Sequence, residues 1–194
     1  MKITYHGHAC FTVESEGYSI VLDPYKGVKG FEDVDLEANE VLCSHGHFDH
    51  AYTEGVRIIE GGKSPFEVKI VECFHDDKEG AARGKNKITV LSAEGKNIAH
   101  FGDLGHLLSE DQAGELKGLD CVMIPVCGFF TINAAQAVEI LRKIEPKYII
   151  PMHYKDGDKG LEVVGTVEQF IDFLTEDEKK KLLLVKGYEE TVEI

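Results

Sequence analysis

Four side chains of types that bind metal ions lie within one short stretch of the sequence. They are His45, His47, Asp49 and His50, and they follow residues 40–44, an apolar-leaning run that is typical of a short strand. Imidazole and carboxylate groups are the usual protein ligands of zinc, and they also suit manganese and iron. Because a strand that ends in a glycine-containing loop can turn several side chains toward one point, this stretch predicts part of a metal site. The alternative is a polar loop that is rich in histidine by chance.

Three further candidate ligands argue against chance. Each of His75, Asp103 and His153 comes directly after a run that is typical of a buried strand. Taken singly, a histidine at a strand end is more often hydrogen-bonded than metal-bound, and a Gly-Asp pair is a common turn. Loops at strand ends are where folds place their chemistry, so ligands at several separate strand ends predict one shared site.

The elements that must position these residues are mostly strands in the first half and strands with helices in the second. Strands are expected at residues 3–5, 9–14, 18–22, 40–44, 56–60, 66–74, 87–93, 97–101, 120–126, 147–152 and 182–186. Helices are expected at residues 109–116, 133–144 and 166–174. The second helix has apolar residues at three- and four-residue steps and ends before Pro146. The charged run 175–181 reads as a solvated turn or helix end, and residues 76–84 as a mobile surface loop.

The chain of 194 residues is long enough for one domain, residues 1–194, with a substantial core. Two mixed β-sheets packed face to face with helices outside fit the order of its elements, which is an α+β class. The formal charge of −14 argues against binding to nucleic acid or to an anionic membrane, because both need clustered Lys and Arg. A small anionic substrate is still compatible with this net charge, because bound cations make a site locally positive.

The same composition predicts a cytoplasmic protein. Its five cysteines contain no Cys-x-x-Cys pair and lie mostly in apolar runs, which favours reduced thiols. No apolar run approaches membrane-spanning length, so membrane insertion is not expected. The expected partner is a small-molecule substrate, and the negative net charge does not exclude an anionic one.

The ligand pattern resembles that of the metallo-β-lactamase fold superfamily of metal-dependent hydrolases. His45-x-His47-x-Asp49-His50 matches its His-x-His-x-Asp-His signature, and the three later candidates match its later ligands in order and spacing. The sequence is most similar to the small single-domain branch that includes L-ascorbate-6-phosphate lactonase-like and N-acylphosphatidylethanolamine phospholipase D-like proteins. Residues 7–9, 23–24, 102–106 and 151–154 carry this narrower likeness.

The resemblance implies a four-layer αββα sandwich and two adjacent divalent metal ions, zinc first and manganese or iron as alternatives. It implies that His45, His47 and His75 hold the first ion, that Asp49, His50 and His153 hold the second, and that Asp103 bridges both. A hydroxide between the ions would then cleave a small ester, lactone or phosphodiester, with Asp49, Asp103 and His8 as catalytic residues. The sequence shows no side-chain nucleophile motif such as Gly-x-Ser-x-Gly.

Other residues are expected around this centre. Asp23 is a candidate hydrogen-bond partner of a ligand histidine, although an Asp before Pro24 also forms simple turns. His8 is expected to bind a substrate anion or to protonate a leaving group, while His100 within a strand is expected to be structural. Candidate substrate-binding residues are His106, Arg83, Phe129 and Asn133.

Two other functions fit the same ligands. A mononuclear-iron oxygenase on this fold would keep the early histidines and use one metal. A metal-dependent binding module would hold metal without turnover. The full ligand set favours hydrolysis over both.

Overall fold

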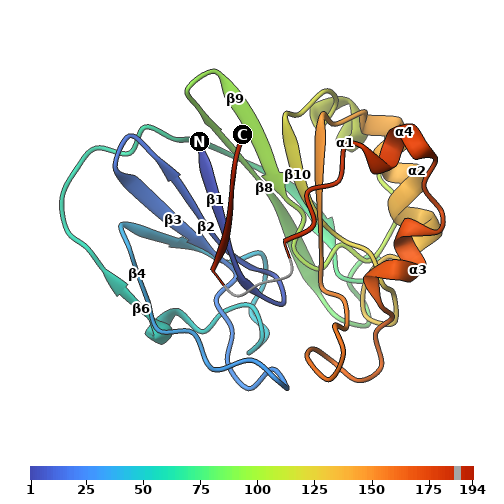
Figure 1. The fold of residues 1–194 in the computed structure, drawn as a ribbon, viewed down its shortest axis with the longest axis horizontal. Coiled ribbons are helices and arrows are strands. Elements are labelled where there is room, and N and C mark those ends of the chain that lie inside the picture. Colours follow the sequence, from blue (N-terminus) through green and yellow to red (C-terminus); the bar gives the residue numbers. More distant parts are fainter. Residues whose placement is uncertain (186–188) are drawn as a thin grey trace.

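The computed structural model describes residues 1–185 and 189–194, which form two five-stranded sheets packed face to face (Figure 1). The first sheet contains, in spatial order, β12 (Glu190–Glu193), β1 (Lys2–Gly7), β2 (Cys10–Ser15), β3 (Tyr18–Leu22) and β5 (Glu40–Leu42). The second contains β11 (Tyr148–Met152), β10 (Cys121–Pro125), β9 (Lys96–His100), β8 (Lys85–Ala93) and β7 (Glu67–Phe74). Each sheet has antiparallel and parallel neighbours, so both are mixed and the predicted α+β class is confirmed.

The core lies between the two sheets, and strand alternation builds it. Ile3, Phe11 and Val13 of the first sheet share one buried cluster with Ile88 of the second. Because successive side chains of a strand point to opposite faces, Thr12 lies on the other face of the first sheet, where it bonds to the His6 ring. The sheets are therefore held together by apolar burial, which is the dominant favourable term in folding.

The four α-helices of the described residues cover the outer face of the second sheet (Figure 1). They are α1 (Glu110–Glu115), α2 (Ala134–Ile144), α3 (Val167–Ile171) and α4 (Glu176–Lys179). The predicted capping box of α1 is present, because Ser109 and Gln112 bond to each other's backbone N–H groups. None of the described helices is long and apolar enough to span a membrane.

The outer layer over the first sheet is thinner. It consists of the two-stranded ribbon β4 (Leu36–Ala38) and β6 (Val56–Ile58), a short 3-10 helix η1 (Thr53–Gly55) and the loops that join them. Tyr25, Val34 and Val56 of this layer pack on Cys10 and Val21 of the sheet in a second apolar cluster. This layer carries the chain from β3 to the predicted metal-binding stretch and beyond it.

Some expected elements differ from those observed. Residues 182–185 form no strand, because Leu182 makes only an isolated bridge to Ile149, and Lys186 lies outside the described residues. The helix expected at residues 166–174 is reduced to α3, with turns after it. The sequence did not predict β4 or β12. β4 has only three residues, which is too short for a strand pattern, and β12 consists mostly of polar, exposed residues; both pair through the backbone with distant strands.

Candidate metal centre

Three predicted ligands lie at one edge of the second sheet. His75 follows β7, Asp103 lies shortly after β9, and His153 follows β11. These three strands run in the same direction, because β8 is antiparallel to both β7 and β9 while β10 is parallel to β9 and β11. Their carboxyl ends therefore meet at the same edge, and the tertiary structure brings together residues that are far apart in the sequence.

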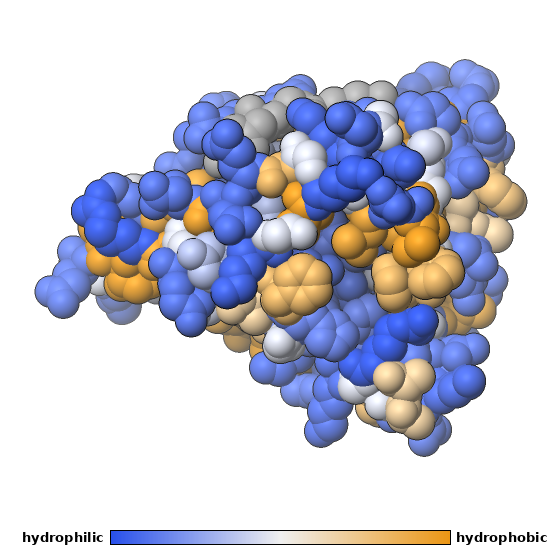
Figure 2. All heavy atoms as spheres, turned by 90° about the horizontal axis from the view of Figure 1, so that it is seen from below, coloured by the Kyte–Doolittle hydropathy of each residue, from blue (hydrophilic) through white to orange (hydrophobic). Residues whose placement is uncertain are grey.

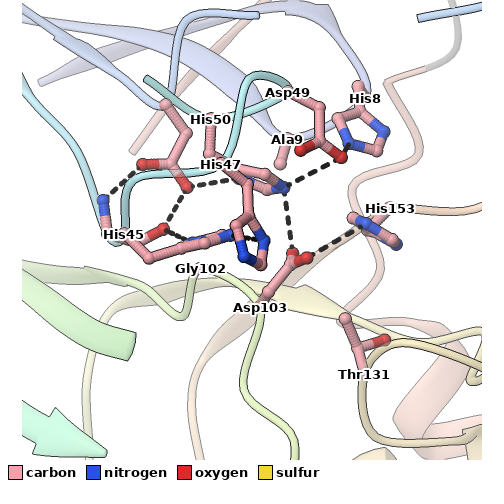
Figure 3. Close-up of polar contacts among 12 residues, drawn as sticks. His8, Ala9, His45, His47, Asp49, His50, Gly102, Asp103, Thr131 and His153 are labelled. Carbon is pink, nitrogen blue, oxygen red and sulfur yellow. Dashed lines mark hydrogen bonds and ion pairs between the residues drawn. The ribbon is translucent and has the colours of Figure 1, made fainter. Parts of the chain in front are cut away.

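The stretch after β5 faces this edge from the first sheet (Figure 3). A close backbone approach makes that possible: Gly102 has φ +53, and a Cβ there would lie 2.4 Å from the Cβ of Ser44. The Asp103 N–H donates to Oδ1 of Asn86 at 3.0 Å, which fixes the turn that carries the carboxylate. The glycine thus lets the two ligand-bearing loops pack against each other.

Asp103 lies at the middle of the cluster. Its Oδ1 is 3.2 Å from Nε2 of His50, and its Oδ2 is 3.2 Å from Nε2 of His75 and 3.3 Å from Nε2 of His153. Burial raises the pKa of this carboxyl, but His153 and His50 outweigh burial and hold the pKa well below its ordinary value. Asp103 is therefore an anion surrounded by imidazoles, as expected of a carboxylate that two cations share.

The candidate ligands fall into two groups around Asp103. Within each group the ligand atoms lie within 4.8 Å of one another: one group is His45, His47 and His75, and the other is His8, Asp49, His50 and His153. All seven ligands predicted from the sequence thus come together. The first group equals one set that the resemblance implied, whereas the second contains His8 in addition to its set, and Asp23, His45 and His50 form a third, overlapping group. Their role as ligands stays a prediction.

The residues fit a metal on a test that is independent of the resemblance. Among the described residues, Nε2 of His50, Nε2 of His153 and Oδ1 of Asp103 are buried in this cluster without a partner in hydrogen-bonding geometry, although the two nitrogens lie 3.2 and 3.3 Å from carboxylate oxygens of Asp103. Burying a polar atom without a partner costs about 1–3 kcal/mol. Several such atoms that converge on one point are explained if they coordinate cations.

Asp23 orients one of these histidines, as the sequence predicted. Nδ1–H of His50 donates to Oδ2 of Asp23 at 2.7 Å, while the N–H and hydroxyl of Ser44 also donate to this carboxylate. Because Asp23 accepts from Nδ1, Nε2 is the nitrogen of His50 that faces Asp103. Burial lowers the pKa of His50, but Asp103 and Asp23 outweigh burial and raise that pKa well above its ordinary value.

The hairpin between β1 and β2 contacts residues of both sheets at the centre. The carbonyl of His8 accepts the N–H of His153 at 3.0 Å, and the carbonyl of Ala9 accepts Nε2–H of His100 at 2.8 Å. His100 is therefore structural, as expected. Nε2 of His8 lies 3.3 Å from Oδ2 of Asp49, and burial together with nearby His153 lowers the pKa of His8 to about 4. A neutral His8 ring donating to Asp49 follows from these contacts.

A pocket of about 570 Å³ opens over the centre. It is lined by His47, Asp49, His75, Asp103 and His153 together with Gly46, Phe48, Arg83, Phe130 and Leu161. Figure 2 views the molecule from the end where loops 24–33 and 153–165 lie in Figure 1, and apolar groups gather there among hydrophilic ones. The adjacent aromatics Phe129 and Phe130 indicate an apolar pocket wall from the sequence, and Phe130 lines the pocket. Phe48 and Leu161 were not predicted, although the position of Phe48 between two candidate ligands was a usable signal.

Of the four predicted substrate-binding residues, the structure places Arg83 at this pocket and the other three elsewhere. His106 accepts the Phe74 N–H and donates to the Leu107 carbonyl, so both ring nitrogens serve the backbone. Asn133 caps α2. The Phe129 side chain is 64% exposed and does not line the pocket. The side chains of His106 and Asn133 are instead used in hydrogen bonds to nearby backbone groups. Phe130, the residue after Phe129, lines the pocket in its place.

The loop that carries Arg83 also differs from expectation. Residues 76–84 were expected to be mobile, but Asp76 organises them. Its carboxylate accepts the backbone N–H groups of Lys78, Gly80, Ala82 and Arg83 at 2.7–3.0 Å. Burial raises the pKa of Asp76, but these N–H donors outweigh burial and lower the pKa to about 2.

The fold is that of the metallo-β-lactamase superfamily. A family model described as the beta-lactamase superfamily domain matches residues 2–153, and the chain belongs to this family. A UPF0173 metal-dependent hydrolase of Listeria innocua is 30% identical over 196 residues, covering 79% of this chain and 85% of the relative. One from Carboxydothermus hydrogenoformans is 29% identical over 195 residues, covering 79% and 84%.

Solved structures agree with this assignment. A metallo-β-lactamase superfamily protein from Thermotoga maritima is 35% identical, with a TM-score of 0.70 over 89% of this chain and 85% of that chain. A protein from Veillonella parvula shares 13% identity and the fold, with a TM-score of 0.75 over 99% and 98%. The superfamily predicted from the ligand pattern is confirmed.

Proposed function

We propose that this chain is a hydrolase that uses two divalent metal ions to cleave a small ester, lactone or phosphodiester. The observation that carries this proposal is the buried Asp103 carboxylate, which lies within 3.3 Å of ring nitrogens of His50, His75 and His153. The Nε2 atoms of His50 and His153 are buried there without a hydrogen-bond partner. The names of the relatives, metal-dependent hydrolases, support the same class.

The chain offers one ligand set for each ion. His45, His47 and His75 would hold the first, Asp49, His50 and His153 the second, and Asp103 would contact both. Imidazole with carboxylate suits zinc best, and manganese and iron also fit. Two bound ions would supply a water whose pKa is low enough for attack near neutral pH, and would polarise the bond to be cleaved.

The other residues of the site position these groups. Asp23 fixes the ring of His50 through its Nδ1–H, and His8 donates to the Asp49 carboxylate. The apolar side chains of Phe48, Phe130 and Leu161 at the pocket limit the access of bulk water to the floor. A drier site strengthens each electrostatic interaction within it.

Metal content and turnover test this proposal together. The purified chain is expected to contain about two zinc or manganese ions, to hydrolyse bis-p-nitrophenyl phosphate or a simple lactone, to lose activity on chelation and to regain it with metal. One iron per chain without hydrolysis would instead support an oxygenase. Full metal loading without turnover on esters, lactones and phosphodiesters would support a binding module.

A further inference from the structure

Among the described residues of this acidic chain, Arg83 is the one arginine that makes no ion pair. Of its three arginines, Arg57 pairs with Glu37 and Arg142 with Glu178, whereas Arg83 makes no ion pair with any described residue. The chain carries 35 Asp and Glu against 21 Lys and Arg, so an unpaired guanidinium is unusual here. It is also the one Lys or Arg among the described residues that line the pocket over the metal centre.

The guanidinium is held in place although it has no carboxylate partner. One of its nitrogens, Nη2, donates to the Phe129 carbonyl at 3.3 Å, and its central carbon lies 5.5 Å from the ring centroid of Phe130. At the backbone, the Arg83 N–H donates to Asp76 at 2.7 Å. A guanidinium has five N–H donors in a planar fork, so most of them remain available to a ligand.

The rest of the pocket separates into two chemical surfaces. The floor consists of the candidate metal ligands, while Phe48, Phe130 and Leu161 form apolar walls. Phe48 is 58% exposed, so its ring is accessible to a ligand in the pocket. A molecule that reached the floor would contact the walls and Arg83 at the same time.

Provided that this pocket is the hydrolase site proposed above, we propose that Arg83 selects substrates that carry a carboxylate or phosphate group away from the cleaved bond, next to an apolar portion. Planar guanidinium groups recognise both anions through paired hydrogen bonds. The cleaved bond lies over the floor, the apolar portion contacts Phe48 and Phe130, and the anion pairs with Arg83. Arg83 is thus a specificity-determining residue that takes no part in bond cleavage.

Matched esters test this assignment in the metal-loaded protein. p-Nitrophenyl butanoate is neutral, mono-p-nitrophenyl succinate carries a terminal carboxylate, and the corresponding phosphonate ester separates phosphate from carboxylate preference. Arg83→Gln is expected to raise KM for the preferred anionic ester about 10- to 100-fold, which is the size expected for a hydrogen-bonded charge. Both kcat and the kinetics of the neutral ester should stay the same. Arg57→Gln, an exposed arginine on β6, is the matched control and should change neither substrate.

Calorimetry provides a readout that does not depend on turnover. Wild-type protein is expected to bind 3-phenylpropanoate or phenylphosphonate more tightly than 3-phenylpropanamide, and Arg83→Gln should remove most of that difference while metal content stays unchanged. Equal weakening of neutral and anionic ligands, or no effect of the substitution, would overturn the role of Arg83. If wild-type protein hydrolysed none of the esters, the proposed hydrolase activity would fail, while the binding comparison would still decide the role of Arg83.

Discussion

At the scale of single residues, Asp103 contacts histidines of both groups of the centre. We expect Asp103→Asn to weaken metal binding at both positions and to reduce turnover by orders of magnitude, because a neutral amide cannot offset the repulsion between two cations. Metal content by elemental analysis and the hydrolysis rate measure the two effects. Asp158→Asn, at an exposed carboxylate, is the matched control. Full metal content with a near-normal rate in Asp103→Asn would contradict the shared-ligand assignment.

His8 offers a second test at the same scale. It contacts the carboxylate of Asp49 but none of the three histidines of the other group. We therefore expect His8→Ala to weaken metal binding at the position of Asp49 by about 10- to 100-fold, as is typical when a ligand loses its hydrogen-bond partner. Metal titration should then show one tight and one weakened ion per chain, and equal loss at both positions would count against this role.

At the scale of elements, the loop 76–84 depends on one buried carboxylate. We expect Asp76→Asn to loosen the loop, because it removes the charge that holds four backbone N–H groups. Trypsin, which cleaves after Lys and Arg, should then cut after Lys78 or Arg83 faster than in the wild type, as mass spectrometry of the fragments would show. Asp77→Asn, at the exposed neighbouring position, should leave the cleavage rate unchanged. Equal rates in all three proteins would mean that the loop does not need Asp76.

At the scale of the whole molecule, buried histidines link stability to pH. Burial is the main cause that lowers the pKa of His6 and His8 to about 4 and that of His45 to about 3. The unfolded chain binds protons at these positions near pH ~6.5, whereas the folded chain does not. The free energy of unfolding should therefore fall as the pH decreases from about 6.5 toward 4.

One histidine acts in the opposite direction. The pKa of His50 is raised, so its contribution is fully present below pH ~6.5 and is lost as the pH rises through its folded-state pKa. Urea denaturation at pH 6.5 and pH 4.5 measures the net change in the free energy of unfolding. His6→Gln, which alters no proposed ligand, should make this change smaller. Acid should also release bound metal, because a histidine must be neutral to act as a ligand. A denaturation midpoint that is independent of pH would contradict this account.

Local sequence signals were sufficient to predict the candidate metal ligands and most of the elements that carry them. The signature 45–50, the strand ends before His75 and His153, and the capping box at Ser109 depend on neighbours within a few residues, so spacing and residue type are sufficient to predict them. The same local signals identified the superfamily and the α+β class.

Only the tertiary structure decided the partners of these residues. Asp23 contacts His50 from 27 positions away, and Arg83 contacts Phe129 from 46 positions away, so no local pattern distinguishes an orienting Asp from a turn or a pocket arginine from a loop residue. The pocket walls and strand β12 likewise depend on which distant backbone segments the packed sheets bring together. The physical reason is that hydrogen-bond geometry and burial act between neighbours in space, which sequence order does not specify.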